Sequence, residues 1–227
     1  MDAVHNRTGA VKLAVLVSGG GTNLQALIDR ERNTPDGAPC PFRIELVVSS
    51  SPSAFALERA AKSGIRTETV TPSSVLGEKA ASASKEEKRC AVSDRILELL
   101  RRENIAGVVL AGFLTVLRGP LVEVYAGRII NLHPALLPKF GGFGMWGRHV
   151  HEAVLAAGET ESGCTIHYAD GGCDTGAILL QKRVPVNPGD TPETLAARIA
   201  VQEHQAVVEG AELLAEKIAR EESVPGV

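Results

Sequence analysis

The sequence predicts an α/β domain with a mainly parallel sheet, doubly wound with helices in a Rossmann-like arrangement, and an antiparallel or mixed extension near the C-terminus. Short apolar, β-branched runs alternate with amphipathic stretches over the first half of the chain. Those runs are nearly continuous in apolar residues, as is typical of strands covered on both faces. From Gly163 the pattern changes to the alternating GCTIHYAD and then AILLQKRVPV, which favours an antiparallel or mixed extension.

The expected elements follow one another in strand-helix-strand-helix order. Strands are predicted at 12–18, 43–50, 68–72, 107–113 and 128–132, with helices from Asn23, over 54–64 and over 85–103. Further strands are predicted within 163–170 and 177–186, and a last amphipathic helix from about Pro192 to Arg220. The 73–87 segment is rich in serine and alanine and is predicted to be a polar, mobile loop.

The composition of the chain indicates its domain number and excludes some classes of partner. The chain has 227 residues, 44% of them hydrophobic, which is enough for one α/β domain with a substantial core. We expect residues 1–11 to be a disordered tail and 12–227 to form that single domain. The 24 basic and 27 acidic residues leave a net charge of -3, so neither nucleic acid nor a membrane surface is an expected partner.

The cysteines indicate the compartment. The chain has four of them and no CxxC pair, which suggests reduced thiols in the cytoplasm instead of a disulfide framework. The apolar run near the N-terminus is short and soon followed by glycines, which is unlike a signal or membrane segment.

The run Ser18-Gly19-Gly20-Gly21-Thr22-Asn23 stands between the first strand and the first helix. Glycines at this point let backbone N–H groups at a helix N-terminus face an anion, although such a cluster can also serve close helix packing alone. A Walker loop would end in Gly-Lys-Ser/Thr, and a dinucleotide fingerprint would have a glycine where Leu24 stands. A site for a single phosphate remains.

Asn131 and His133 end the run RIINLHP and lie two residues apart, so in a strand they point to the same side. An amide N–H beside an imidazolium suits a developing oxyanion. The glycine-rich run 170–176 offers Asp170 and Asp174 as partners that would keep the histidine charged. Turn capping by these polar residues is the alternative.

Together, LVSGGGTNLQALI, VVLAGFLTVL, IINLHPALLPKF, DGGCDTGAILLQ and VQEHQAVV resemble the phosphoribosylglycinamide formyltransferase family, in the family's order and from about Lys12 to the last helix. The resemblance implies the formyltransferase fold. It also implies formyl transfer from 10-formyltetrahydrofolate to the amine of 5′-phosphoribosylglycinamide (GAR), in de novo purine (IMP) synthesis, by a monomer or homodimer. No metal is expected.

The resemblance also carries roles onto this sequence. It implies a catalytic trio of Asn131, His133 and Asp174, in which Asp174 keeps His133 protonated while Asn131 and His133 stabilise the oxyanion. It implies that GAR is bound by Gly21, Thr22, Asn23 and Glu203. It implies that 10-formyltetrahydrofolate is bound by Arg89, Leu114, Thr115, Val116, Leu117, Asn131, Asp170, Gly171, Gly172, Cys173 and Asp174. A formyltetrahydrofolate hydrolase and a non-catalytic nucleotide- or folate-binding module are the alternatives.

A glycine-rich stretch over 141–151 is expected to form a mobile lid or a substrate-contact loop. His149 and His151 are two residues apart at a helix start and would not share a helical face, so capping or packing is expected of them instead of metal binding. His167, in an alternating strand, is expected to be structural.

Overall fold

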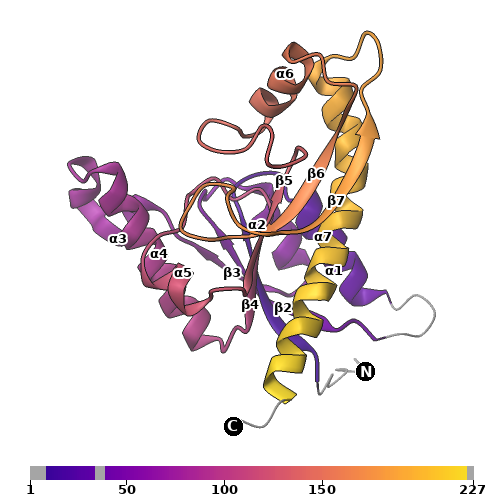
Figure 1. The fold of residues 1–227 in the computed structure, drawn as a ribbon. Helices are drawn as coiled ribbons and strands as arrows, with labels where there is room; N and C mark the ends of the chain where they lie inside the picture. The colour runs from indigo at the N-terminus through magenta and orange to yellow at the C-terminus, as the bar shows by residue number, and fades with distance from the viewer. Residues whose placement is uncertain (1–8, 34–38, 224–227) are drawn as a thin grey trace.

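A computed structural model of the chain describes residues 9–33 and 39–223. Its centre is a seven-stranded sheet in the order β3-β2-β1-β4-β5-β6-β7, shown in Figure 1. The strands are β1 (Val11–Val17), β2 (Phe42–Ser49), β3 (Arg66–Thr69), β4 (Gly107–Leu110), β5 (Ile129–His133), β6 (Glu161–Tyr168) and β7 (Ile178–Pro185). The first five pair in parallel, whereas β6 and β7 pair antiparallel. The predicted fold class is confirmed.

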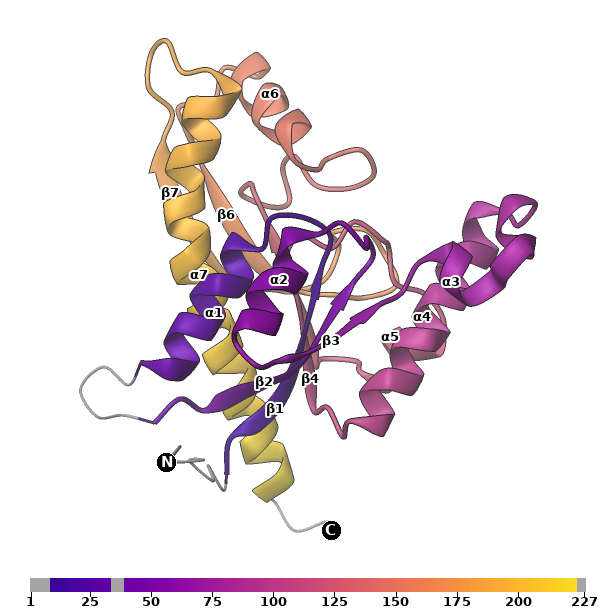
Figure 2. The same cartoon turned by 180° about the vertical axis from the view of Figure 1, so that it is seen from behind.

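Helices cover both faces of the sheet, as Figures 1 and 2 show. They are α1 (Thr22–Arg32), α2 (Phe55–Lys62), α4 (Lys85–Arg102), α5 (Pro120–Val124), α6 (Arg148–Ala156) and α7 (Pro192–Ser223). Side chains along β1 alternate between the two faces of the sheet, so they contribute to a separate hydrophobic core on each face. Leu13 and Val15 pack into the core under α1, α2 and α7, whereas Ala14 and Leu16 pack into the core under α4 and α5.

The 73–87 segment differs from the expected mobile loop. It forms α3 (Pro72–Leu76) and the 3₁₀ helix η2 (Gly77–Ala81) before α4 begins. Thr71 Oγ1 accepts a hydrogen bond from Ser74 N at 3.0 Å, and Ser74 Oγ accepts one from Thr71 N at 2.9 Å. This capping box starts α3, with Pro72 in its first turn. Short polar residues favour both turns and caps, so composition alone did not separate them.

The ends of the described chain are a strand and a helix. β1 begins at Val11, and residues 1–8 of the expected tail lie outside the described residues. At the other end, α7 lies so close to the sheet that a Cβ on Gly210 would be 2.9 Å from Ile166 Cγ2. Within the described ranges, no helix is long and apolar enough to cross a membrane.

The strand order also predicts where a ligand binds. From β1 the chain adds β2 and β3 on one side, and from β4 it adds β5 on the other. The carboxyl ends of β1 and β4 therefore form a topological switch point, where open α/β sheets bind ligands.

Candidate active site

One cavity of about 730 Å³ opens at the carboxyl ends of β4 and β5. Its walls are the end of β5, the loop after β4, the loop from Gly142 to Gly147 and the β6–β7 loop. The predicted site residues that line it are Asn23, Arg89, Leu114, Thr115, Val116, Leu117, Asn131, His133, Asp170, Gly172, Cys173, Asp174 and Glu203. Gly21, Thr22 and Gly171 do not line it.

β5 and β6 fix the polar floor of this cavity. Asn131 and His133 on β5 lie opposite His167 and Thr165 on the antiparallel neighbour β6. His167 is buried, and its Nδ1 donates to the Tyr168 carbonyl at 2.9 Å. Its Nε2 is then an acceptor, and Asn131 Nδ2 donates to it at 3.0 Å. His167 therefore orients Asn131 as well as packing in the sheet, which the sequence reasoning missed.

Asp174 reaches the same point from the β6–β7 loop, in a left-handed conformation with φ 58°. It accepts a hydrogen bond from Gly142 N at 3.0 Å and one from Asn131 Nδ2 at 3.4 Å. Burial acts to raise the pKa of Asp174, but the Gly142 N–H and the His133 ring act to lower it, and the pKa is below its ordinary value. Asp174 is ionised at neutral pH.

His133 is 3% exposed and has an acceptor at each ring nitrogen. Its Nε2 donates to the Phe140 carbonyl at 2.8 Å, and its Nδ1 lies 3.6 Å from Asp174 Oδ2. Burial lowers the pKa of His133 below its ordinary value, whereas Asp174 and the Phe140 carbonyl act to raise it. Asp174 thus acts in the direction expected from the sequence, but burial has the larger effect on the His133 pKa.

The two histidines at the start of α6 differ from each other. His149 is exposed, lies edge-on to Trp146 at 5.4 Å between ring centroids, and is 3.4 Å from Glu152. His151 is buried in the cavity wall, where burial and then His133 lower its pKa. No group of three or more metal-binding side chains occurs in the part of the chain that the structure describes.

In the glycine loop before α1, Gly21 is closely packed, whereas Gly19 and Gly20 face open space. Gly21 has φ 73°, and a Cβ there would lie 2.6 Å from Ala56 Cβ, so this glycine lets α1 and α2 approach. Gly19 and Gly20 are exposed and have open space where a Cβ would stand. Arg59 Nε donates to the Gly20 carbonyl at 2.9 Å, which places a cation beside the loop.

Glu203 on α7 connects the glycine loop to the cavity. Its Oε2 accepts a hydrogen bond from Asn23 Nδ2 at 3.1 Å, across 180 residues of chain. Burial raises the pKa of Glu203, and the hydrogen bond from Asn23 partly offsets this. The side chain therefore lines the cavity as a carboxylate that a cationic ligand would stabilise.

The opposite side of the cavity is built from loops. Asp170 Oδ1 accepts from Gly172 N at 2.8 Å and from Thr175 Oγ1 at 2.7 Å, which holds the β6–β7 loop in shape. The Gly171 carbonyl points away and accepts from Arg118 Nη1 at 3.2 Å. Leu114 N donates to Ser18 Oγ at 3.0 Å and ties the loop after β4 to the end of β1.

All four cysteines lie in the described chain and none forms a disulfide. Cys173 lines the cavity, where burial and Asp174 raise the pKa of its thiol. Burial raises the pKa of Cys164 to about 12. Neither thiol is set up as a nucleophile at neutral pH.

The chain is similar to known proteins over most of its length. The formyl transferase family matches residues 11–210. A trifunctional purine biosynthetic protein, adenosine-3, of Drosophila pseudoobscura pseudoobscura is 44% identical over 90% of the chain, which spans 14% of that relative's length. The chloroplastic phosphoribosylglycinamide formyltransferase of Arabidopsis thaliana is 37% identical over 99% of the chain and 73% of the relative.

A solved structure agrees with the sequence relatives. Glycinamide ribonucleotide transformylase 1 of Symbiobacterium toebii superimposes with a TM-score of 0.79 at 33% identity, over 95% of this chain and 92% of that one. Similarity in sequence and similarity in fold therefore cover nearly the same part of the chain. The chain belongs to the phosphoribosylglycinamide formyltransferase family.

Proposed function

We propose that this protein transfers the formyl group of 10-formyltetrahydrofolate to the amine of GAR, giving formyl-GAR and tetrahydrofolate in de novo purine synthesis. The observation that carries the proposal is the meeting of Asn131, His133 and Asp174 in one cavity that also contains Glu203. Similar proteins named phosphoribosylglycinamide formyltransferase support the choice of substrate.

The acceptor side consists of the glycine loop and Glu203. Gly21, Thr22 and Asn23 bind the phosphate of GAR at the N-terminus of α1, where backbone N–H groups and the helix dipole favour an anion. Arg59 beside the loop adds positive charge. Glu203 holds the amine end of GAR, and Asn23 orients the carboxylate through their 3.1 Å hydrogen bond.

The donor side consists of the loops. A cavity of about 730 Å³ is within the range of about 300–1,000 Å³ that small-molecule sites occupy. We assign contacts with 10-formyltetrahydrofolate to Arg89, Leu114–Leu117 and Asp170–Asp174, with Gly171 contributing through loop shape. Asn131 contacts the formyl group itself.

The chemistry is addition of the amine to the formyl carbon, followed by loss of the folate nitrogen, which takes up, directly or through water, the proton that the amine releases. Asn131 Nδ2 and His133 Nε2 donate to the oxygen as it gains negative charge. In the structure His133 Nε2 donates to the Phe140 carbonyl. The formyl oxygen must therefore replace the Phe140 carbonyl as the acceptor of this hydrogen bond. The ionised Asp174 favours the protonated form of His133 and partly offsets the effect of its burial.

The chain's organisation and location are part of the proposal. Residues 12–227 form one formyltransferase domain, active as a monomer or homodimer. Four cysteines without a disulfide fit a reducing compartment, and we propose the cytoplasm. The similar Arabidopsis protein is named as chloroplastic.

The test is release of deformylated folate from 10-formyltetrahydrofolate, followed by absorbance in parallel samples with and without GAR. Release that depends on GAR supports the transferase. Release without GAR would point to the hydrolase. Absence of release in both samples, with binding of either ligand retained, would point to a non-catalytic binding module.

A further inference from the structure

The start of α2 lies against the glycine loop before α1, and Figure 2 shows the two helices side by side. Two successive carbonyls of this loop are hydrogen-bonded to α2. Ala56 N donates to the Gly19 carbonyl at 3.1 Å. Arg59 Nε donates to the Gly20 carbonyl at 2.9 Å. Because the C=O and N–H of a trans peptide point in opposite directions, the N–H groups of Gly20 and Gly21 point away from α2.

The backbone turns at Gly21 so that three N–H groups converge. Gly21 is left-handed, with φ 73° and ψ 30°, and Thr22 begins the right-handed helix α1. A left-handed residue next to a right-handed one brings successive N–H groups together into a concavity that binds an anion. These groups belong to Gly21, Thr22 and Asn23, and within the described chain none of the three donates to a protein acceptor. Arg59 therefore holds the peptide that supplies the first of them.

Arg59 is held in one orientation without the pairing of its charge to a carboxylate. Its guanidinium carbon lies 5.0 Å from the centroid of the Phe55 ring, and its Nη1 donates to Gln25 Oε1 at 3.2 Å. In residues 9–33 and 39–223 no carboxylate forms an ion pair with it. A ring on one face and acceptors at two nitrogens fix the planar fork. The charge therefore remains available to an anion bound beside the loop.

We infer that Arg59 is a positioning residue for the phosphate of the acceptor. It holds the peptide between Gly20 and Gly21 with the N–H facing the phosphate, and its charge adds to the attraction. Glycines alone do not fix which way such a peptide faces, because their backbone is free to adopt many conformations. The inference rests on the proposed function and adds α2 to an acceptor site otherwise made of the glycine loop and Glu203.

Binding of ribose 5-phosphate tests the inference without turnover, because this probe has the phosphate and lacks the amine. Arg59→Ala should weaken its binding about fivefold to twentyfold in a titration followed by NMR, the effect expected of one charged hydrogen-bonding group. In the wild type the Gly21 amide signal should shift on binding. At the same saturation in the variant this shift should be smaller, since the peptide no longer has a fixed direction.

Arg59→Lys separates the orientation of the peptide from the charge. Lysine retains the positive charge, but its single nitrogen cannot reproduce a fixed fork between the Gly20 carbonyl and Gln25. This variant should therefore recover only part of the affinity for ribose 5-phosphate that Arg59→Ala loses. Binding equal to the wild type in Arg59→Lys would mean that charge alone is needed, and would overturn the positioning role.

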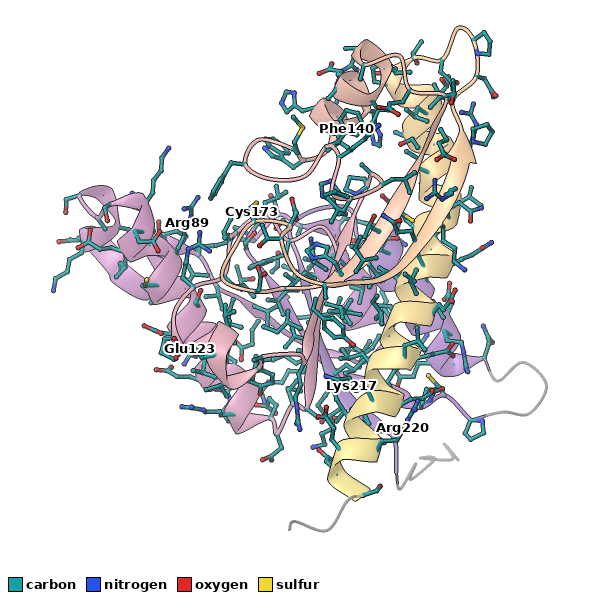
Figure 3. The ribbon with its side chains drawn as sticks, in the orientation of Figure 1. Arg89, Glu123, Phe140, Cys173, Lys217 and Arg220 are labelled. Atoms are coloured by element: carbon teal, nitrogen blue, oxygen red, sulfur yellow. The ribbon has the colours of Figure 1, made fainter. Side chains whose placement is uncertain are left out.

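Two other arginines serve as controls for the loss of a guanidinium. Arg32, at the opposite end of α1, also donates to a backbone carbonyl, that of Ser63 at 2.9 Å. Arg89, which Figure 3 labels on α4, lines the cavity on the donor side. Arg32→Ala and Arg89→Ala should both bind ribose 5-phosphate like the wild type. Weakening by either variant equal to that of Arg59→Ala would reduce the effect to overall charge and would overturn the inference.

Kinetics separate the inference from the proposed function. Arg59→Ala should raise KM for GAR about fivefold to twentyfold, with kcat and KM for 10-formyltetrahydrofolate unchanged. Wild-type binding of ribose 5-phosphate by this variant would overturn the inference and leave the transferase assignment in place. Equal rises in both KM values would mean a general loss of structure and would also overturn the inference. Absence of GAR-dependent release from the wild type, with ribose 5-phosphate binding that still requires Arg59, would overturn the proposed function alone.

Discussion

Two walls of the cavity differ in how they are built. Asn131, His133 and His167 lie on paired strands, and both histidines are almost fully buried. The facing wall consists of loops, where Phe143 and Trp146 are more than half exposed. Strand pairing fixes a side chain through its neighbours, whereas a loop fixes it only through a few hydrogen bonds and its own glycines. The strand wall is therefore suited to hold side chains in place beside the reacting atoms. The loop wall is suited to recognise a large co-substrate.

Asp174 is the one proposed catalytic residue that lies on a loop. Substituting it should have the largest effect on turnover. It comes from a loop but accepts bonds from both walls, Asn131 on one side and Gly142 on the other. Asp174→Asn and His133→Asn should each reduce kcat about 10²-fold to 10³-fold, since each removes stabilisation of the oxyanion. Affinity for GAR, measured by calorimetry, should change little. Turnover equal to the wild type in either variant would remove that residue from the mechanism.

Glu203→Gln tests whether the carboxylate on α7 binds the amine end of GAR. Loss of a charge-assisted contact should raise KM for GAR about 10-fold to 100-fold. Burial raises the pKa of Glu203, so in the wild type KM for GAR should rise as pH falls through that raised value, from a pH above the ordinary glutamate range. The variant should lack this pH dependence.

The same substitution has a consequence for stability. A carboxyl whose folded pKa is raised contributes stability that is fully present below its unfolded pKa and is lost as pH rises through the folded pKa. Ionised Glu203 is therefore unfavourable at neutral pH, and the glutamine variant should unfold at a higher temperature there. A lower Tm would show that the charge is compensated within the protein.

His167 tests whether the strand wall orients Asn131. His167→Leu removes the acceptor of the 3.0 Å bond from Asn131, so kcat should fall about tenfold while both KM values stay within twofold. His167→Gln retains an acceptor and should recover part of the loss. Equal kcat in the two variants would reduce His167 to a packing role.

Two glycines, one in the loop before α1 and one in the loop from Gly142 to Gly147, give the smallest and most direct comparison. Gly21 and Gly144 both have positive φ, but only Gly21 has a neighbour where a Cβ would stand. Gly21→Ala should lower the free energy of unfolding by about 3 kcal/mol, because strain and overpacking add. Gly144→Ala should cost about 1 kcal/mol, from strain alone. Urea denaturation measures both, and equal losses would mean that crowding at Ala56 is relieved by movement.

Much of the fold follows from periodicity. The near-continuous apolar strands indicate a buried parallel sheet because helices cover both faces, and the switch to alternation after Gly163 marks the antiparallel strands. The prediction of a loop over 73–87 was wrong in its first part, because Thr71 and Ser74 have the composition of a loop but form the capping box of α3. Which of these occurs depends on contacts that composition does not contain.

The site was predictable where a strand period or a strand end positions the residue. Asn131 and His133 are two apart at the end of a strand, which is enough to place them together. The register between β5 and β6 is needed to bring His167 to Asn131, and register is not visible in either strand alone. The exposure of Phe143 and Trp146 depends on loop backbone, which the glycines leave open to many conformations.

The direction of the strands has a further consequence at the chain ends. Since the carboxyl ends of the parallel strands face the cavity, β1 begins at the opposite edge of the sheet, and α7 ends near it, as Figure 1 shows. The start of β1 and the end of α7 therefore lie away from the cavity mouth, so a ligand enters between loops and not past either of them.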